Sequence, residues 1–281
     1  MKLTFLGVGS AFTLPCPAEY AGMARTTDGK LQLITLDDCD WQSNALIESD
    51  SGKKMLIDCG SDIRFALWQQ KLGYKNIDAV YISHLHADHI GGLEWLAFCR
   101  YFDKSAGAHP IMYSERALIT ELWNNSLKGG LNCIEGQTMH LEDYFECRPF
   151  DINDHFIWEG IKFIPFQTVH VMAGSAIKNS YGLEIECPSR NAEVIRILFT
   201  TDSQFCPSQI DVFYRRAQYI FQDCETSKYP SRVHAHYNLL KNLDQEIKSR
   251  MMLYHYQPNP EQNPEADGFK GFARKGQVFE F

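Results

Sequence analysis

The stretch from residue 84 to residue 89 is dense in side chains that can bind metal ions. His84, His86, Asp88 and His89 occupy four of its six positions. In an extended segment, side chains two residues apart point to the same side, so His84 and His86 can hold one cation together. Asp88 and His89 fall on the following turn and can hold a second. Such nitrogen and oxygen donors bind zinc at about 2.0–2.2 Å, and a catalytic zinc ion keeps one position open for water.

The elements that position this cluster alternate along the chain between strand-like apolar runs and helical patterns, which predicts an α/β layered fold. We expect strands at residues 2–6, 44–48, 54–57, 79–82, 111–113, 161–165, 181–186, 195–199, 219–222 and 251–254, and a strand-like tail within 268–281. We expect helices at residues 63–72, 93–102, 114–127 (with Gly129 and Gly130 as the stop) and 237–250. The cluster then directly follows a buried strand. A single domain, 1–281, is predicted, with a loop or hairpin insertion at about 15–40.

Composition narrows the class of protein further. The chain has 281 residues and a formal net charge of −8, and an acidic surface repels a nucleic-acid backbone. A small substrate is therefore favoured over long nucleic acid. No run approaches the roughly 20 apolar residues of a membrane helix. The nine cysteines are scattered without a Cys-x-x-Cys pair, which predicts reduced thiols and a cytoplasmic protein.

The sequence SHLHADHIGGL at residues 83–93 resembles the His-x-His-x-Asp-His signature of the metallo-β-lactamase superfamily. Further motifs appear in the order of that family, namely LGVGSA at 6–11, LIDCG at 56–60, LFTTDS at 198–203 and MLYHYQ at 252–257. The resemblance extends over nearly the whole chain. It implies a four-layer αββα sandwich and a metal-dependent hydrolase.

The resemblance also implies a ligand set for two divalent metal ions. One metal is expected on His84, His86, His170 and Asp202, and the other on Asp88, His89, Asp202 and His255. Asp58 is expected to orient a histidine ligand. The metals are expected to be zinc, although mixed His and Asp ligands also suit manganese and iron. A water that bridges two metals becomes a hydroxide near neutral pH and can attack an electrophilic centre.

The stretch DCETSKYPSRVHAHYNLL at residues 223–240 resembles a region of ribonuclease Z and related phosphodiesterases. In that branch a histidine held by a glutamate donates the proton to the leaving group. Glu225 with His234 would fill these roles here, and His236 is the alternative to His234. In this chain Asp88 is also expected to be a catalytic residue. LIDCGSDIR is similar to phosphoribosyl cyclic phosphodiesterases.

The leading hypothesis is a dinuclear phosphodiesterase acting on a small phosphodiester such as a cyclic nucleotide or cyclic phosphate. The basic Gly/Pro-rich arm with which ribonuclease Z clamps tRNA is missing, although a ribonuclease Z-like tRNA 3′-end endonuclease stays an alternative. Lys178 or Arg190 could contact a phosphate, but ordinary surface cations are the simpler interpretation. The motifs are also compatible with a hydrolase of lactones, thioesters or lactams, with a redox protein of cofactor biosynthesis, and with a nucleotide sensor without turnover. Relatives are often homodimers.

Overall fold

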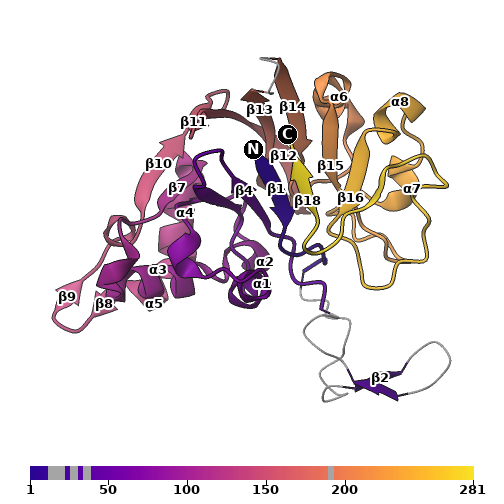
Figure 1. The fold of residues 1–281 in the computed structure, drawn as a ribbon. Coiled ribbons are helices and arrows are strands. Elements are labelled where there is room, and N and C mark those ends of the chain that lie inside the picture. Colours follow the sequence, from indigo (N-terminus) through magenta and orange to yellow (C-terminus); the bar gives the residue numbers. More distant parts are fainter. Residues whose placement is uncertain (12–22, 26–30, 34–38, 189–192) are drawn as a thin grey trace.

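The fold is built on two seven-stranded sheets that lie face to face (Figure 1). The computed structural model describes residues 1–11, 23–25, 31–33, 39–188 and 193–281. In spatial order, the first sheet has β10 (Glu146–Phe150), β7 (Ile111–Glu115), β6 (Ala79–Tyr81), β5 (Lys54–Ile57), β4 (Ala45–Glu48), β1 (Lys2–Phe5) and β18 (Val278–Glu280). The second sheet has β11 (Phe156–Trp158), β12 (Ile161–Ala173), β13 (Ala176–Pro188), β14 (Val194–Phe199), β15 (Tyr219–Asp223), β16 (Met251–Tyr254) and β17 (Gly271–Phe272).

A layer of aromatic side chains joins the two sheets. The ring of Phe5 on β1 lies 6.0 Å from that of Phe199 on β14 and 5.3 Å from that of Phe221 on β15. All three side chains are buried. Aromatic pairs of this kind contribute about 0.5–1.5 kcal/mol beyond the burial of their area. The contacts therefore hold the sheets in a defined position relative to each other.

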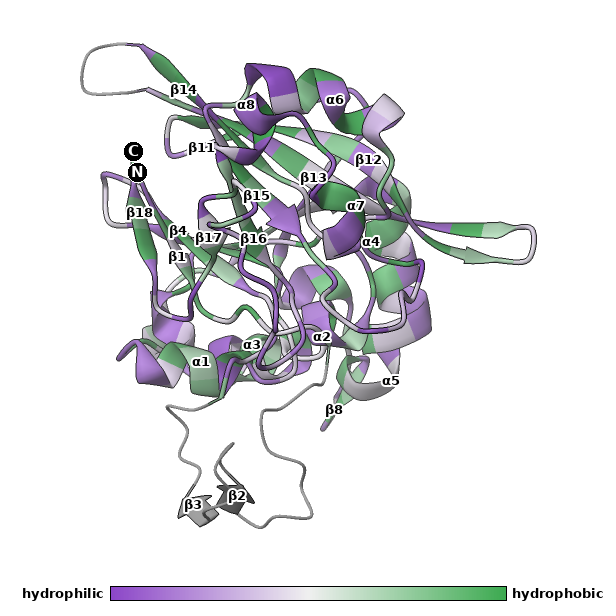
Figure 2. Cartoon of the chain, turned by 90° about the vertical axis from the view of Figure 1, so that its right-hand side faces the viewer, coloured by the Kyte–Doolittle hydropathy of each residue, from purple (hydrophilic) through white to green (hydrophobic). Residues whose placement is uncertain are grey.

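Helices cover the outer face of each sheet, which completes the expected αββα sandwich (Figure 1). On the first sheet lie α1 (Ile63–Gln69), α3 (Leu93–Phe102) and α4 (Arg116–Leu122), and on the second lie α6 (Pro207–Arg216), α7 (Tyr237–Leu240) and α8 (Gln245–Lys248). In α1 the side chains of Ile63 and Leu67 are buried, whereas Trp68 is exposed, as expected for an amphipathic helix that packs on the core through one face. Figure 2 shows hydrophobic residues concentrated in the strands and hydrophilic ones on short outer helices such as α8.

Two helix predictions need correction. The predicted helix 237–250 is two short helices, because Asp244 adopts an extended backbone (φ −52°, ψ 140°) while Leu240 and Ile247 on either side stay buried. The predicted helix stop at Gly129 and Gly130 lies inside a helix. The chain continues from α4 through a π-helical turn, η5 (Trp123–Leu127), into α5 (Lys128–Leu131), and the side chains of Leu127 and Leu131 are buried.

The expected insertion at about 15–40 lies mostly outside the described residues. Its described parts, β2 (Met23–Arg25) and β3 (Leu31–Leu33), pair antiparallel. In the part of the chain that the structure describes, no helix is long and apolar enough to cross a membrane.

The carboxyl ends of parallel strands bring the polar residues of the motifs to one edge of the sandwich. Strands β5 and β6 are parallel in the first sheet, and β14, β15 and β16 are parallel in the second. Asp58, Thr201 and His255, which follow β5, β14 and β16, have positive φ angles of 64°, 52° and 62°. Such strained backbone in non-glycine residues is typical of functional sites. The chain thus turns sharply where the motif side chains leave the sheets.

We predict that Gly60→Ala lowers the free energy of unfolding by about 1–3 kcal/mol, the usual cost of overpacking. A Cβ atom at Gly60 would lie 2.1 Å from the main-chain oxygen of Asp88. Urea denaturation of the wild type and the variant measures the loss. Gly73→Ala is the matched control, because it has open space and an extended backbone (φ −153°). Equal stability of the two variants would contradict the close packing of residue 60 against the motif.

Candidate metal centre

The structure brings all seven predicted metal ligands together around the carboxylate of Asp202. Its Oδ2 atom lies 3.7 Å from His84 Nε2, 3.3 Å from His89 Nε2, 3.7 Å from His170 Nε2 and 3.5 Å from His255 Nε2. Ligands of a tetrahedral zinc ion at about 2.0–2.2 Å stand roughly 3.3–3.6 Å from one another. The observed spacing therefore fits donor atoms that share cations.

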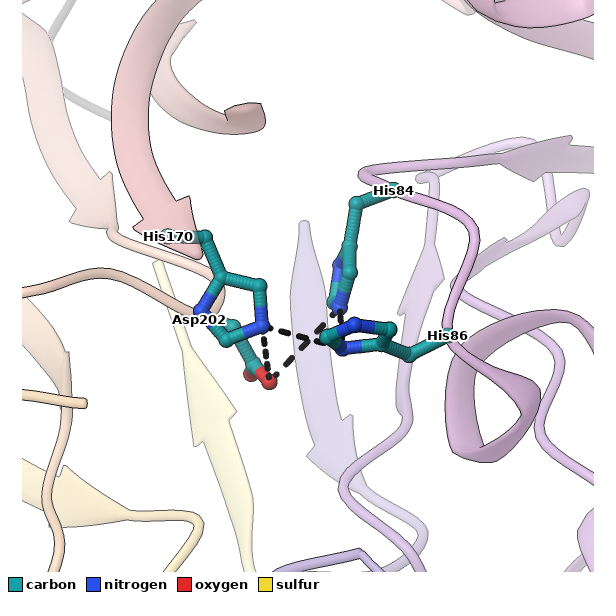
Figure 3. Close-up of side chains that lie close together, drawn as sticks. All are labelled: His84, His86, His170 and Asp202. Atoms are coloured by element: carbon teal, nitrogen blue, oxygen red, sulfur yellow. Dashed lines mark hydrogen bonds and ion pairs between the residues drawn. The ribbon is translucent and has the colours of Figure 1, made fainter. Parts of the chain in front are cut away.

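The first cluster combines ligands from both sheets (Figure 3). His84 and His86 follow β6 in the first sheet, whereas His170 and Asp202 belong to the second. His170 lies inside the long strand β12 rather than after a strand ending at residue 165. The pairing with β13 is interrupted by a bulge between Val169 and Val171, and a bulge re-aims a side chain.

His170 and His84 each carry a proton on Nδ1, so the lone pairs on their Nε2 atoms point at the centre of this cluster. The His170 Nδ1 atom donates to the main-chain oxygen of Val233 at 2.8 Å. The hydroxyl of Ser83 donates to Asp58 and so accepts from His84 Nδ1 at 2.9 Å. The Nε2 atoms of His84 and His170 then lie 3.1 and 3.0 Å from Nδ1 of His86. The single proton that His86 Nδ1 can carry cannot satisfy both neighbours, whereas a cation between the three nitrogens can.

The second cluster consists of Asp88, His89, Asp202 and His255, all of them buried. Asp88 Oδ2 lies 3.3 Å from His89 Nε2 and 3.6 Å from His255 Nε2. These two Nε2 atoms are buried and have no hydrogen-bond partner among the residues that the structure describes. Buried polar atoms are almost always satisfied, so orphaned nitrogens that face carboxylates fit ligands of a second cation.

Burial and charge divide the histidines into two groups. Burial lowers the pKa of His84 far below its usual value and that of His170 to about 4, so both are neutral and ready to bind metal. Burial also acts to lower the pKa of His255, but the carboxylates of Asp202, Asp223 and Asp88 outweigh it and raise the pKa to about 10. The buried carboxylates therefore need nearby positive charge to be stable, and metal cations can supply it in place of protons.

Asp58 supports ligands of both clusters, as expected for a residue that orients a histidine. Its Oδ2 atom accepts from His89 Nδ1 at 2.7 Å and from the Ser83 hydroxyl at 2.7 Å. Its Oδ1 atom accepts from the main-chain nitrogen of Ser83 at 2.8 Å. One buried carboxylate therefore fixes the ring of His89 directly and that of His84 through Ser83.

The expected pairing of Glu225 with His234 is wrong, because Asp223 takes the place of the glutamate. His234 Nδ1 lies 3.0 Å from Asp223 Oδ2 and 3.8 Å from Asp202 Oδ2. The carboxylate of Glu225 instead accepts from the Ser227 hydroxyl at 2.5 Å and from the Ser231 main-chain nitrogen at 2.9 Å. Glu225 thus fastens the loop that carries His234. The overlooked signal is an acidic residue at the end of a buried strand, a position that Asp223 shares with Asp58 and Asp202.

His236 is directed away from the centre, whereas His234 lies beside Asp202. Its Nε2 atom lies 2.9 Å from the main-chain oxygen of Ser227, and its Nδ1 atom accepts from the Asn238 main-chain nitrogen at the start of α7. Burial acts to lower the pKa of His234, but the carboxylates of Asp223 and Asp202 outweigh it, and the pKa is raised. Of the two histidines, His234 is thus the one that lies at the centre, and its pKa is raised there.

Of the two cations that could contact a phosphate, the structure describes only Lys178. The ammonium of Lys178 forms an ion pair with Glu121, and Arg190 is outside the described residues. A cavity of about 310 Å³ opens beside His84, His86 and His170, and Lys178 lies on its wall.

Known proteins match this chain over most of its length. The family model described as Anti-Pycsar protein Apyc1 matches residues 35–279. The chain belongs to this family. The Apyc1 protein of Paenibacillus harenae is 34% identical over 219 residues, which cover 76% of this chain and 82% of the relative. The Apyc1 protein of Bacillus phage vB_BveM-Goe7 is 28% identical over 285 residues and covers 98% of this chain and 96% of the relative.

Solved structures confirm the metallo-β-lactamase fold of this Apyc1 family member. A diphosphatase of the PhnP family superposes with a TM-score of 0.71 at 20% identity and covers 100% of this chain and 97% of its own. The metallo-β-lactamase fold protein YhfI of Bacillus subtilis superposes with a TM-score of 0.68 at 18% identity and covers 99% of both chains. At these identities the likeness establishes the fold, and this is the fold predicted from the sequence.

We predict that Asp58→Asn weakens metal binding by about 10- to 100-fold, the usual effect of removing a group that orients a ligand. Asparagine keeps the shape of the side chain but loses the negative charge that polarises His89 and Ser83. Titration of the metal-free protein with zinc against a chelating indicator measures the change. Asp78→Asn is the matched control, because Asp78 also accepts bonds from Lys53 and Lys54 but lies at the opposite end of β6. Equal affinities of the two variants would contradict the role of Asp58.

Proposed function

We propose that this protein is a metal-dependent phosphodiesterase that hydrolyses cyclic nucleotides at the centre around Asp202. The observation that carries the proposal is a pair of His/Asp clusters that share Asp202, with the His234–Asp223 pair directly beside them. Membership of the Anti-Pycsar protein Apyc1 family supports a cyclic nucleotide as the phosphodiester and agrees with the hydrolase expected from the motifs.

We assign one cation to His84, His86, His170 and Asp202, and a second to Asp88, His89, Asp202 and His255. When bound, two divalent cations supply a hydroxide nucleophile at neutral pH and offset the charge that develops on the phosphoryl oxygens. Zinc is the proposed ion, and the mixed imidazole and carboxylate donors also suit manganese and iron. Asp88 and Asp202 contribute the negative charge that retains cations at this position.

His234 is the proposed general acid of the reaction. Its Nδ1 atom is held by Asp223, so the proton available to a leaving oxygen is the one on Nε2. The two neighbouring carboxylates favour the protonated ring, which a general acid requires. Glu225 acts indirectly, since it holds the loop on which His234 is placed. Opening a cyclic phosphodiester releases an alkoxide, and this proton neutralises it.

A small substrate fits both the charge and the dimensions of the site. The formal net charge of −8 disfavours a long phosphate backbone. The cavity of about 310 Å³ beside the centre is at the lower end of the range for small-molecule sites. We also propose a cytoplasmic location and a homodimer, which the scattered cysteines and the superfamily resemblance suggest.

We predict that the wild type hydrolyses bis-p-nitrophenyl phosphate and at least one 2′,3′- or 3′,5′-cyclic nucleotide, with about two metal ions bound. Asp202→Ala removes the carboxylate common to both clusters and should abolish turnover and reduce the metal content. Metal analysis and turnover are measured on the same sample. Two bound metals without any phosphodiester turnover would overturn the proposed function and direct the search to lactones and thioesters.

We predict that His234→Ala lowers kcat for cyclic nucleotides by about 10²- to 10⁴-fold, the usual contribution of general acid catalysis. The loss should be much smaller with bis-p-nitrophenyl phosphate, because its nitrophenolate leaves without a proton. His236→Asn is the matched control, since asparagine can still cap α7. Equal losses on both substrates would exclude the role of His234 as the acid.

A further inference from the structure

The cavity beside the metal centre is also lined by residues that are not metal ligands. His84, His86 and His170 line the end nearest the cations. The opposite walls come from two elements, the helical segment of α4 and η5 and the hairpin strand β13. The side chains that they contribute are Leu118, Glu121, Asn125, Ser126, Lys178 and Asn179. A phosphodiester held at the metals would extend its remaining part between these walls.

Two asparagine side chains on these walls have unused hydrogen-bonding capacity. Asn125 lies in the π-helical turn η5, and Asn179 lies on β13 and is half-buried. Among the described residues, neither side-chain amide has a hydrogen-bond partner, although each can donate two bonds and accept two. π-helical turns are rare and recur at functional sites, where they change the direction of the side chains that they carry. A donor and an acceptor side by side match the polar edge of a nucleobase.

An ion pair joins the two walls. Glu121 on α4 and Lys178 on β13 contact each other across the cavity, so the ammonium of Lys178 already has a partner. Lys178 is adjacent to Asn179, and Glu121 lies one helical turn before Asn125. The ion pair therefore sets the separation of the two asparagines. Leu85 and Leu118 contribute apolar surface on which a flat ring can rest.

We propose that Asn125 and Asn179 bind the nucleobase of the cyclic nucleotide and determine base preference, and that the Glu121–Lys178 ion pair positions them. The inference rests on the proposed function, because it requires a phosphodiester at the metal centre. The two asparagines contact the substrate, whereas Glu121 and Lys178 act through them.

The test compares cyclic nucleotides carrying each of the four bases with bis-p-nitrophenyl phosphate, a diester without a base. Asn125→Ala and Asn179→Ala should each lower kcat/KM for the preferred cyclic nucleotide by about tenfold, as expected for lost hydrogen bonds. Each should also narrow the differences in kcat/KM between cyclic nucleotides that carry different bases. Turnover of the base-free diester should change less than twofold. Asn124→Ala is the matched control, because Asn124 is the neighbouring exposed residue of the same turn and does not line the cavity.

The role of the ion pair is tested by Lys178→Met, which should raise KM for cyclic nucleotides severalfold with little change in kcat. Arg116→Met breaks the exposed Arg116–Asp151 ion pair at the start of α4 and should leave both constants unchanged. The positioning role would be overturned if Lys178→Met raised KM for the base-free diester by the same factor as KM for cyclic nucleotides.

The failure of this inference is distinguishable from the failure of the proposed function. A wild type that hydrolyses none of the diesters contradicts the proposed function itself. A wild type that is active, with asparagine variants that keep the wild-type base preference or lose activity equally on all substrates, contradicts base recognition alone.

Discussion

The buried carboxylate of Asp202 imposes a constraint that many of the surrounding residues satisfy. It is 1% exposed, and its Oδ2 atom lies within 3.3–3.8 Å of nitrogen atoms of five histidines. Removing a carboxylate from water costs several kcal/mol unless positive charge compensates it. The same requirement applies to Asp88 and Asp223, which are also buried. The charge balance of the centre therefore depends on cations, and the protein retains its carboxylates inside because metal binding stabilises them.

Packing between the sheets determines whether the metal centre can form at all. The first cluster takes two histidines from the loop after β6 and its other two ligands from the second sheet. A displacement of one sheet by about 1 Å would take the donor atoms outside the narrow range of metal–ligand distances. The aromatic layer around Phe5 prevents such a displacement. Stability of the core and geometry of the site are thus two consequences of the same contacts.

The predicted fold agrees with the solved structures, and the metal-dependent phosphodiesterase chemistry agrees with the family. The individual roles of the ligands stay predictions, and the geometry supports them to different degrees. The seven ligand positions converge as expected, and Asp58 contacts a histidine as expected. The expected Glu225–His234 pair is the exception, since His234 contacts Asp223 and Glu225 holds the loop.

The sequence by itself determined the ligand motif at residues 84–89 and the succession of strands along the chain, because both depend on local spacing. His84, His86, Asp88 and His89 lie within six consecutive positions, and apolar runs of strand length identify the strands without tertiary information. Only the tertiary structure shows that His234 rather than His236 lies at the centre, and that Asp223 rather than Glu225 contacts it. Those choices depend on contacts with residues that are distant in sequence, such as Asp202, or on the path of a loop. Side chains two positions apart have the same local pattern, and only the surrounding fold determines which of them faces the site.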